Sequence, residues 1–61
     1  MNKTKLRTIR EQKGLTQKEL AEKAGVVQSL ISMVESGTAN FSIKVAKRVC
    51  AVLGCKIDDI L

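Results

Sequence analysis

The chain has 61 residues, enough for one domain (residues 1–61) with a small core, because a chain of this size buries only about 60% of its unfolded surface. Its 11 Lys and Arg against 6 Asp and Glu give a formal net charge of +5, which suits a polyanionic partner. With no His, Trp or Tyr and a single Phe, it offers few catalytic side chains and no aromatic platform for single-stranded bases.

Runs of helical periodicity recur along the chain, and a glycine follows each of four of them. Gly14, Gly25, Gly37 and Gly54 stand where a left-handed residue ends a helix. No run alternates with period two, and no Asn-Gly or Asp-Gly hairpin signal occurs. The pattern predicts an all-α fold of five helices.

The first two predicted helices span residues 3–13 and 17–24. The second has the clearest start, because Thr16 as cap and Glu19 three residues later form a capping box. Ala21 is small where another helix must cross closely.

The third predicted helix, residues 28–36, has an apolar side formed by Ile31 and Val34. Its other side carries no charge and consists of Gln28, Ser29, Ser32 and Met33. A helix face that is merely solvated usually carries charge. Small, neutral hydrogen-bonding groups with one Met suit the edges of base pairs better.

A loop over residues 38–41 leads to Ser42, the expected cap of a fourth helix over residues 43–53. The core stripe predicted for this helix is Ile43, Ala46, Val49, Cys50 and Leu53. A fifth short helix over residues 57–61 is expected because Asp58 and Asp59 supply the negative charge that a helix N-terminus prefers.

The second and third predicted helices, joined by a turn at Gly25, form a helix-turn-helix unit. In such a unit the first helix crosses the DNA backbone, and the second lies in the major groove with its N-terminal residues toward the bases. Gly25 permits the turn and Ala21 the close crossing. The apolar side chains that hold the unit to the rest of the domain are Leu20, Val26, Ile31 and Val34.

A wider pattern covers nearly the whole chain. It consists of Leu6, Arg10, Gly14, Leu15-Thr16-Gln17, Glu19-Leu20-Ala21, Ala24-Gly25-Val26, Gln28-Ser29, Ile31-Ser32, Val34-Glu35, Gly37, Ala51-Val52-Leu53-Gly54 and Asp58-Asp59-Ile60-Leu61. In these residues the chain resembles the phage repressor and Cro-type helix-turn-helix family, also called the xenobiotic-response-element family. The resemblance implies a five-helix, lambda-repressor-like bundle that binds a specific operator, often as a dimer.

The resemblance also implies roles for individual residues. Base contacts are expected from Gln28, Ser29, Ser32 and Met33, and Val27 joins them because an apolar side chain can meet a thymine methyl. DNA backbone contacts are expected from Arg10, Thr16, Gln17, Thr38, Asn40, Ser42 and Lys44. Gln17 is further expected to brace Gln28, and Arg10 to form an ion pair with Glu35 that locks the first helix against the third. Independently, a Gln amide can bond adenine at N6 and N7 together, and Met33 or Val27 can meet a thymine methyl.

Three positions depart from the family pattern. Val27 stands where Ser or Thr is common, which indicates either tolerance of a missing cap or a contact with a thymine methyl. Met33 replaces Arg or another polar residue, and Phe41 replaces Pro; we expect Phe41 to pack in the core or at a subunit contact rather than stack on a base. The alternatives are that Arg10 and Glu35 are ordinary solvated charges, and that Gln28 and Ser29 are surface residues without a function.

Apolar residues near the C-terminus indicate self-association. The predicted dimer interface consists of Val45, Val52, Ile57, Ile60 and Leu61. A two-fold homodimer would place two recognition helices about 34 Å apart on a roughly palindromic site.

Together these features predict a DNA-binding transcriptional regulator, most simply a repressor, that binds double-stranded DNA. The alternative is an antitoxin or protein-interaction adaptor with the same fold. We expect no enzyme activity, cofactor or metal, since Cys50 and Cys55 without His cannot complete a four-ligand zinc site. No segment resembles a signal peptide or membrane span, so we expect a cytoplasmic protein of a prokaryotic cell or phage, switched by its concentration, a regulatory protein partner or proteolysis.

Overall fold

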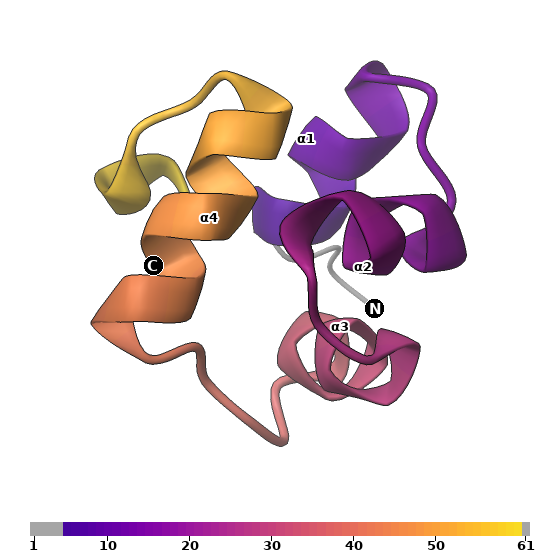
Figure 1. The fold of residues 1–61 in the computed structure, drawn as a ribbon, viewed down its shortest axis with the longest axis vertical. Coiled ribbons are helices and arrows are strands. Elements are labelled where there is room, and N and C mark those ends of the chain that lie inside the picture. The colour runs from indigo at the N-terminus through magenta and orange to yellow at the C-terminus, as the bar shows by residue number, and fades with distance from the viewer. Residues whose placement is uncertain (1–4, 61) are drawn as a thin grey trace.

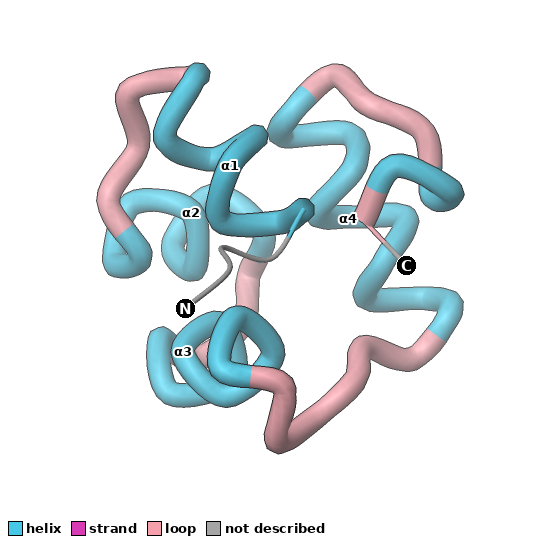
Figure 2. Tube along the Cα trace, turned by 180° about the vertical axis from the view of Figure 1, so that it is seen from behind, coloured by secondary structure: helices cyan, strands magenta, loops and turns pink. Residues whose placement is uncertain are grey.

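The computed structural model describes residues 5–60, which fold into four α-helices followed by one 3-10 turn (Figure 1). The elements are α1 (Lys5–Gln12), α2 (Gln17–Ala24), α3 (Gln28–Ser36), α4 (Ile43–Leu53) and η1 (Ile57–Asp59). Helix α2 contacts both α3 and α4, α1 packs against α3, and η1 packs against α4. Seen from behind, the described residues contain helices and loops and no strand (Figure 2).

The predicted capping box at the start of α2 is confirmed. The Glu19 amide donates to Thr16 Oγ1 at 3.0 Å, and the Thr16 amide donates to Glu19 Oε1 at 2.9 Å. These bonds lower the pKa of Glu19 below its usual value. The largest cause is the hydrogen bond from the Thr16 backbone, and the next is the hydrogen bond with the Thr16 side chain. The helix ends at Gly25, whose φ of +72° is a left-handed conformation that favours glycine.

The core is built from the apolar sides of all four helices. The largest fully buried side chains are Leu6, Leu20, Ile31, Val49 and Leu53. The core stripe predicted for α4 is confirmed except at Ile43, which is 62% exposed. Ile43 is the first residue of α4, and it lies at the edge of the buried stripe, where the loop enters the helix.

The prediction of a fifth helix over residues 57–61 is corrected by the structure, because η1 is a single 3-10 turn. It is held by bonds between residues three apart, from the Asp59 amide to Lys56 O at 2.9 Å and from the Ile60 amide to Ile57 O at 3.1 Å. A segment this short cannot offset the cost of nucleating an α-helix. Leu61, and residues 3 and 4 of the predicted first helix, lie outside the described residues; α1 ends at Gln12, one residue early.

None of the helices in the described part of the chain combines the length and the apolar character needed to cross a bilayer.

Candidate nucleic-acid interface

The turn between α2 and α3 fixes the two helices of the motif relative to each other. The Gly25 amide donates to the carbonyl groups at the end of α2, and the Val26 amide donates to Ala21 O at 3.0 Å. Ala21 and Ala24 are buried, with exposed fractions of 2% and 4%. These small side chains allow α2 to pack closely against α3. Helix α3 lies at the outer edge of the fold, so the side that does not face α2 is open to solvent (Figure 1).

The solvent side of α3 is the uncharged face expected from the sequence. Its exposed residues are Gln28, Ser29, Ser32, Met33 and Ser36. Ile31 is fully buried on the opposite side. Ser36 was not among the residues expected on this face, although it continues the four-residue spacing of Gln28 and Ser32. We call these five exposed residues the reading face.

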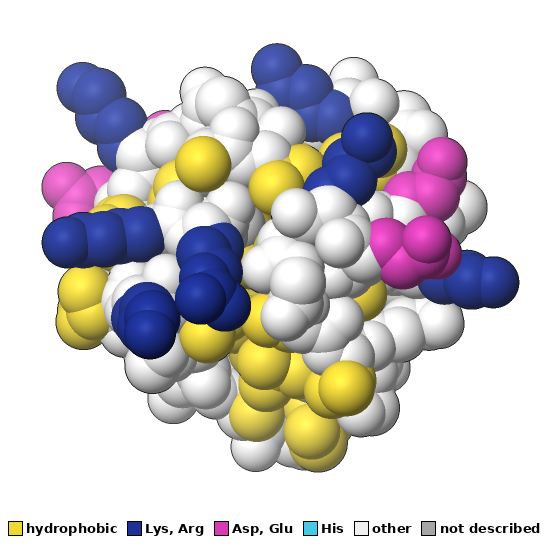
Figure 3. Space-filling view, viewed as in Figure 1, with side chains coloured by type: hydrophobic (Ala, Val, Ile, Leu, Met, Phe, Trp, Pro, Cys, Tyr) yellow, Lys and Arg dark blue, Asp and Glu magenta, His cyan; other side chains and the backbone are white. Residues whose placement is uncertain are grey.

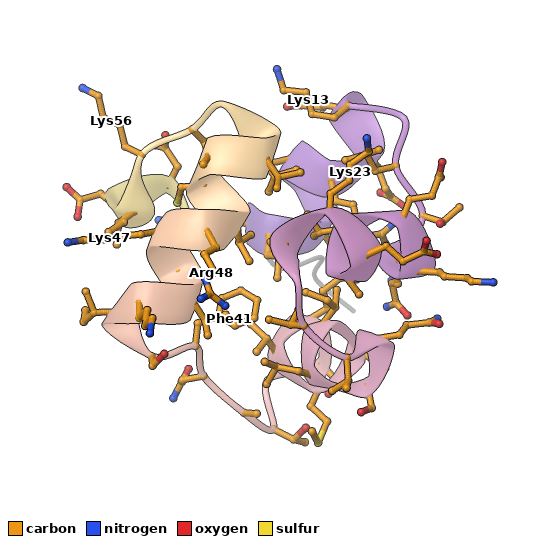
Figure 4. The ribbon with its side chains drawn as sticks, in the orientation of Figure 1. Lys13, Lys23, Phe41, Lys47, Arg48 and Lys56 are labelled. Atoms are coloured by element: carbon orange, nitrogen blue, oxygen red, sulfur yellow. The ribbon has the colours of Figure 1, made fainter. Side chains whose placement is uncertain are left out.

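Charged side chains lie away from α3 on the side of the molecule seen in Figure 3, where the surface over α3 shows apolar and uncharged atoms. Figure 4 shows Lys47 and Lys56 pointing outward at the left edge of the view, away from α3. Lys13 and Lys23 lie above α3 in the same view. Charge and hydrogen-bonding capacity are therefore separated on this protein. In this view the charged side chains do not interrupt the neutral reading face.

Val27 precedes the reading face and leaves the start of α3 without a side-chain cap. Its backbone has the extended conformation of a cap residue, with φ −77° and ψ 146°, but it makes no side-chain hydrogen bond to the helix. The Val27 side chain is 67% exposed, beside the exposed Gln28. An apolar group thus stands in solvent where a hydroxyl would stabilise the helix.

The predicted ion pair between Arg10 and Glu35 is present and buried. Arg10 Nε donates to Glu35 Oε2 at 2.6 Å, and Arg10 Nη2 donates to Glu35 Oε1 at 3.1 Å. The third guanidinium nitrogen, Nη1, donates to Leu15 O at 2.7 Å. The two residues are only 8% and 9% exposed, and the bond to Glu35 is the largest cause of the raised pKa of Arg10.

This geometry assigns Arg10 a structural role. The structure corrects the expectation that Arg10 contacts the DNA backbone, because its side chain is buried and all three guanidinium nitrogens donate within the protein. Gln17 also differs from expectation, since its Nε2 donates to Glu35 Oε1 at 3.1 Å rather than bracing Gln28. Glu35 therefore joins the start of α2 and the end of α1 to α3.

Beyond α3, hydrogen-bonding residues continue along the loop into α4. Thr38 Oγ1 donates to Met33 O at 3.1 Å and lies 3.0 Å from Ser36 Oγ, which ties the loop to the end of α3. Ser42 Oγ accepts from the Val45 amide at 3.2 Å, which confirms Ser42 as the cap of α4. The side chains in this region that the structure leaves exposed are those of Thr38, Asn40, Ser42 and Lys44.

The side chain of Phe41 packs against the core. It is half-buried there, close to Arg48 in the view of Figure 4. The structure thus favours packing over exposure to a base for this residue.

The residues expected at a dimer interface fall into two groups. Val45, Val52 and Ile57 are half-buried against the core and keep part of their surface in solvent. Ile60 is a correction, because it is 8% exposed and belongs to the protein's own core. The turn η1 folds back on α4 and carries Ile60 inward, so a smaller apolar surface remains for a second copy.

Within residues 5–60 no group of three or more His, Cys, Asp or Glu side chains has an arrangement that could hold a metal ion.

The comparison with protein families defines the class. A family model described as helix-turn-helix matches residues 6–60. The chain belongs to the Cro/C1-type helix-turn-helix family.

Curated relatives extend this result. An uncharacterised HTH-type transcriptional regulator of Methanocaldococcus jannaschii is 40% identical over 58 residues, covering 95% of this chain and 88% of the relative. The HTH-type transcriptional regulator SinR of Bacillus subtilis is 38% identical over 58 residues, covering 93% of this chain and 52% of SinR. This chain therefore spans about half the length of SinR.

Solved structures are similar along the whole fold. SinR, a master regulator for biofilm formation, in complex with DNA has a TM-score of 0.87 and 38% identity, covering 93% of this chain and 95% of that one. The clp gene regulator ClgR of Corynebacterium glutamicum has a TM-score of 0.84 and 36% identity, covering 92% and 60%.

Proposed function

We propose that this chain represses transcription by binding a specific double-stranded DNA site with α3 in the major groove. The observation that carries the proposal is the reading face, which is exposed, uncharged and rich in hydrogen-bonding groups, on a helix whose other side is anchored in the core. The likeness to SinR, whose structure was solved in complex with DNA, supports DNA binding by this member of the family.

In this proposal the bases are read by residues at the start and middle of α3. The Gln28 amide bonds an adenine, Ser29 and Ser32 bond neighbouring base edges, and Met33 or Val27 contacts a thymine methyl. The DNA backbone is bound by flanking residues, namely Thr16, Gln17, Thr38, Asn40, Ser42 and Lys44. Because the net charge of +5 lies outside the reading face, the salt-dependent attraction and the base recognition come from different residues.

Two copies would bind a palindromic operator. Val45, Val52 and Ile57 keep apolar surface at the C-terminal end of the fold, and we propose that they meet across a two-fold axis. Occupying an operator in this way blocks other proteins from the same DNA, which is the simplest route to repression.

Selecting bound duplexes from a random library tests the proposal. We expect one enriched sequence with two-fold symmetry. An enriched sequence without symmetry would refute the proposed dimer but not the proposed DNA binding. Gln28→Ala should then weaken binding to the selected site by about 1–3 kcal/mol and change binding to random DNA little. Gln12→Ala is the matched control, because Gln12 is an exposed amide on α1 outside the reading face.

Two results would contradict the assignment. Equal losses on selected and random DNA would remove Gln28 from base recognition. A library that yields no preferred sequence would favour the protein-interaction alternative, in which the same fold binds another protein.

A further inference from the structure

The end of α4 brings the two cysteines of the chain together. Gly54 has a left-handed φ of +67°, and the Cys55 amide donates to Cys50 O at 3.1 Å. This bond spans the ends of a Schellman motif, in which the side chains of the two residues regularly touch. Both thiols are free, and Cys55 packs against the core cluster to which Cys50 belongs. The backbone that ends α4 thus holds the two cysteines next to each other.

The two thiols differ in their access to solvent. Cys50 is 6% exposed on the buried stripe of α4, whereas Cys55 is half-buried. Cys55 lines a hollow of about 580 Å³ between α1 and the end of α4, which lie side by side in Figure 2. Lys5, Lys13 and Asp59 also line this hollow. Reactive cysteines are typically partly exposed, which describes Cys55 and not Cys50.

We propose that Cys50 and Cys55 form a redox-modification site, at which a peroxide converts the two thiols into one intramolecular disulfide. In the first step the Cys55 thiolate attacks an oxygen of hydrogen peroxide, forming a sulfenic acid and releasing hydroxide, which is protonated to water. In the second step the Cys50 sulfur displaces the sulfenic oxygen, which leaves as a second water with the Cys50 proton. The two sulfurs lose two electrons, and the peroxide gains them.

The order of the steps follows from the surroundings of the two thiols. Burial, and next the hydrogen bond with Cys55, raise the pKa of Cys50 to about 11. Its thiol therefore stays protonated near neutral pH and is a poor first nucleophile. As the resolving group it gains from proximity, because the end of α4 already holds the two cysteines next to each other.

The site lies at the opposite end of the fold from the reading face, next to the turn that carries Ile57 (Figure 1). Closing the disulfide requires no change in α3. The inference is independent of the proposed DNA binding, since it rests on the end of α4 alone.

Intact-protein mass spectrometry after hydrogen peroxide treatment tests the proposal. We expect the main product to lose two hydrogen atoms, to stay monomeric on non-reducing electrophoresis and to return to the starting mass with dithiothreitol. Its rate of formation should not depend on protein concentration, and it should be faster in the folded protein than in urea. Cys50→Ala should instead leave a Cys55 sulfenic acid that dimedone traps, whereas Cys55→Ala should react far more slowly.

The controls keep the result clear if a variant folds poorly. Circular dichroism of each variant establishes its fold, and the comparison of folded and unfolded wild-type protein requires no variant. A main product that is a sulfinic acid or a disulfide between two copies would overturn the proposal. So would oxidation that is faster in urea, because the native placement of the two cysteines would then not promote the reaction.

Discussion

Replacing Glu35 with Gln removes a charge from the group that joins α1, α2 and α3. The carboxylate accepts two hydrogen bonds from Arg10 and one from Gln17. Gln keeps the size and one acceptor oxygen but leaves the Arg10 charge unpaired at 8% exposure. Losing hydrogen bonds to a charged group costs about 1.5–3 kcal/mol. For a domain of this size, that lowers the melting temperature by about 6–24 °C.

Thermal unfolding followed by circular dichroism measures this effect, with Glu11→Gln as the control. Glu11 also pairs with an arginine, at 3.5 Å from Arg7 Nε, but the two side chains are 38% and 49% exposed. An exposed pair of this kind contributes about 0–1 kcal/mol. Equal effects of the two substitutions would refute the buried ion pair as a stabilising link. Glu35→Ala should cost about 3–5 kcal/mol, close to the whole stability of so small a core, and leave much of the protein unfolded.

Two further predictions concern the helix starts. Val27→Thr should raise the free energy of unfolding by about 0.5–2 kcal/mol in urea melts, because the backbone at Val27 already has the extended cap conformation; an unchanged midpoint would show that the first amides of α3 need no cap. The lowered pKa of Glu19 stabilises the fold above the pKa of the unfolded chain, and this contribution is lost as the pH falls through the folded value. Between about pH 5 and pH 3, the wild-type protein should therefore lose more unfolding free energy in urea melts than the Glu19→Gln variant. Equal losses would show that the capping box is not the source of this pH dependence.

Local signals predicted most of the fold. The bounds of α2, α3 and α4 follow from glycines and cap residues that act within a few positions of the helix ends, as Thr16 and Ser42 show. The reading face followed from helical spacing, because the side of α3 opposite Ile31 must face solvent. The family resemblance, rather than spacing, supplied the pairing of Arg10 with Glu35.

Non-local packing decided what the sequence did not predict. Ile43 and Ile60 are both isoleucines near a helix end, yet the first is 62% exposed and the second 8% exposed. The difference is one of placement: Ile60 follows η1, which packs against α4, whereas Ile43 is the first residue of α4 and lies at the edge of its buried stripe. The bond from Gln17 to Glu35 likewise joins residues 18 positions apart, which helical periodicity cannot reveal.

The start and the end of α3 are supported differently, and the difference bears on how a neutral helix can read DNA. Glu35, near its end, is fixed by a buried network, whereas Val27, at its start, provides no cap. The start of α3, where the reading face begins, is therefore the part of the helix that its own chain stabilises least. A base pair that contacts Gln28 and Val27 would supply stabilisation where the free protein lacks it. Val27→Thr separates the stability of the free protein from its affinity for DNA. The new hydroxyl should cap α3 and raise the stability, whereas the lost methyl should weaken the contact with a thymine and lower the affinity.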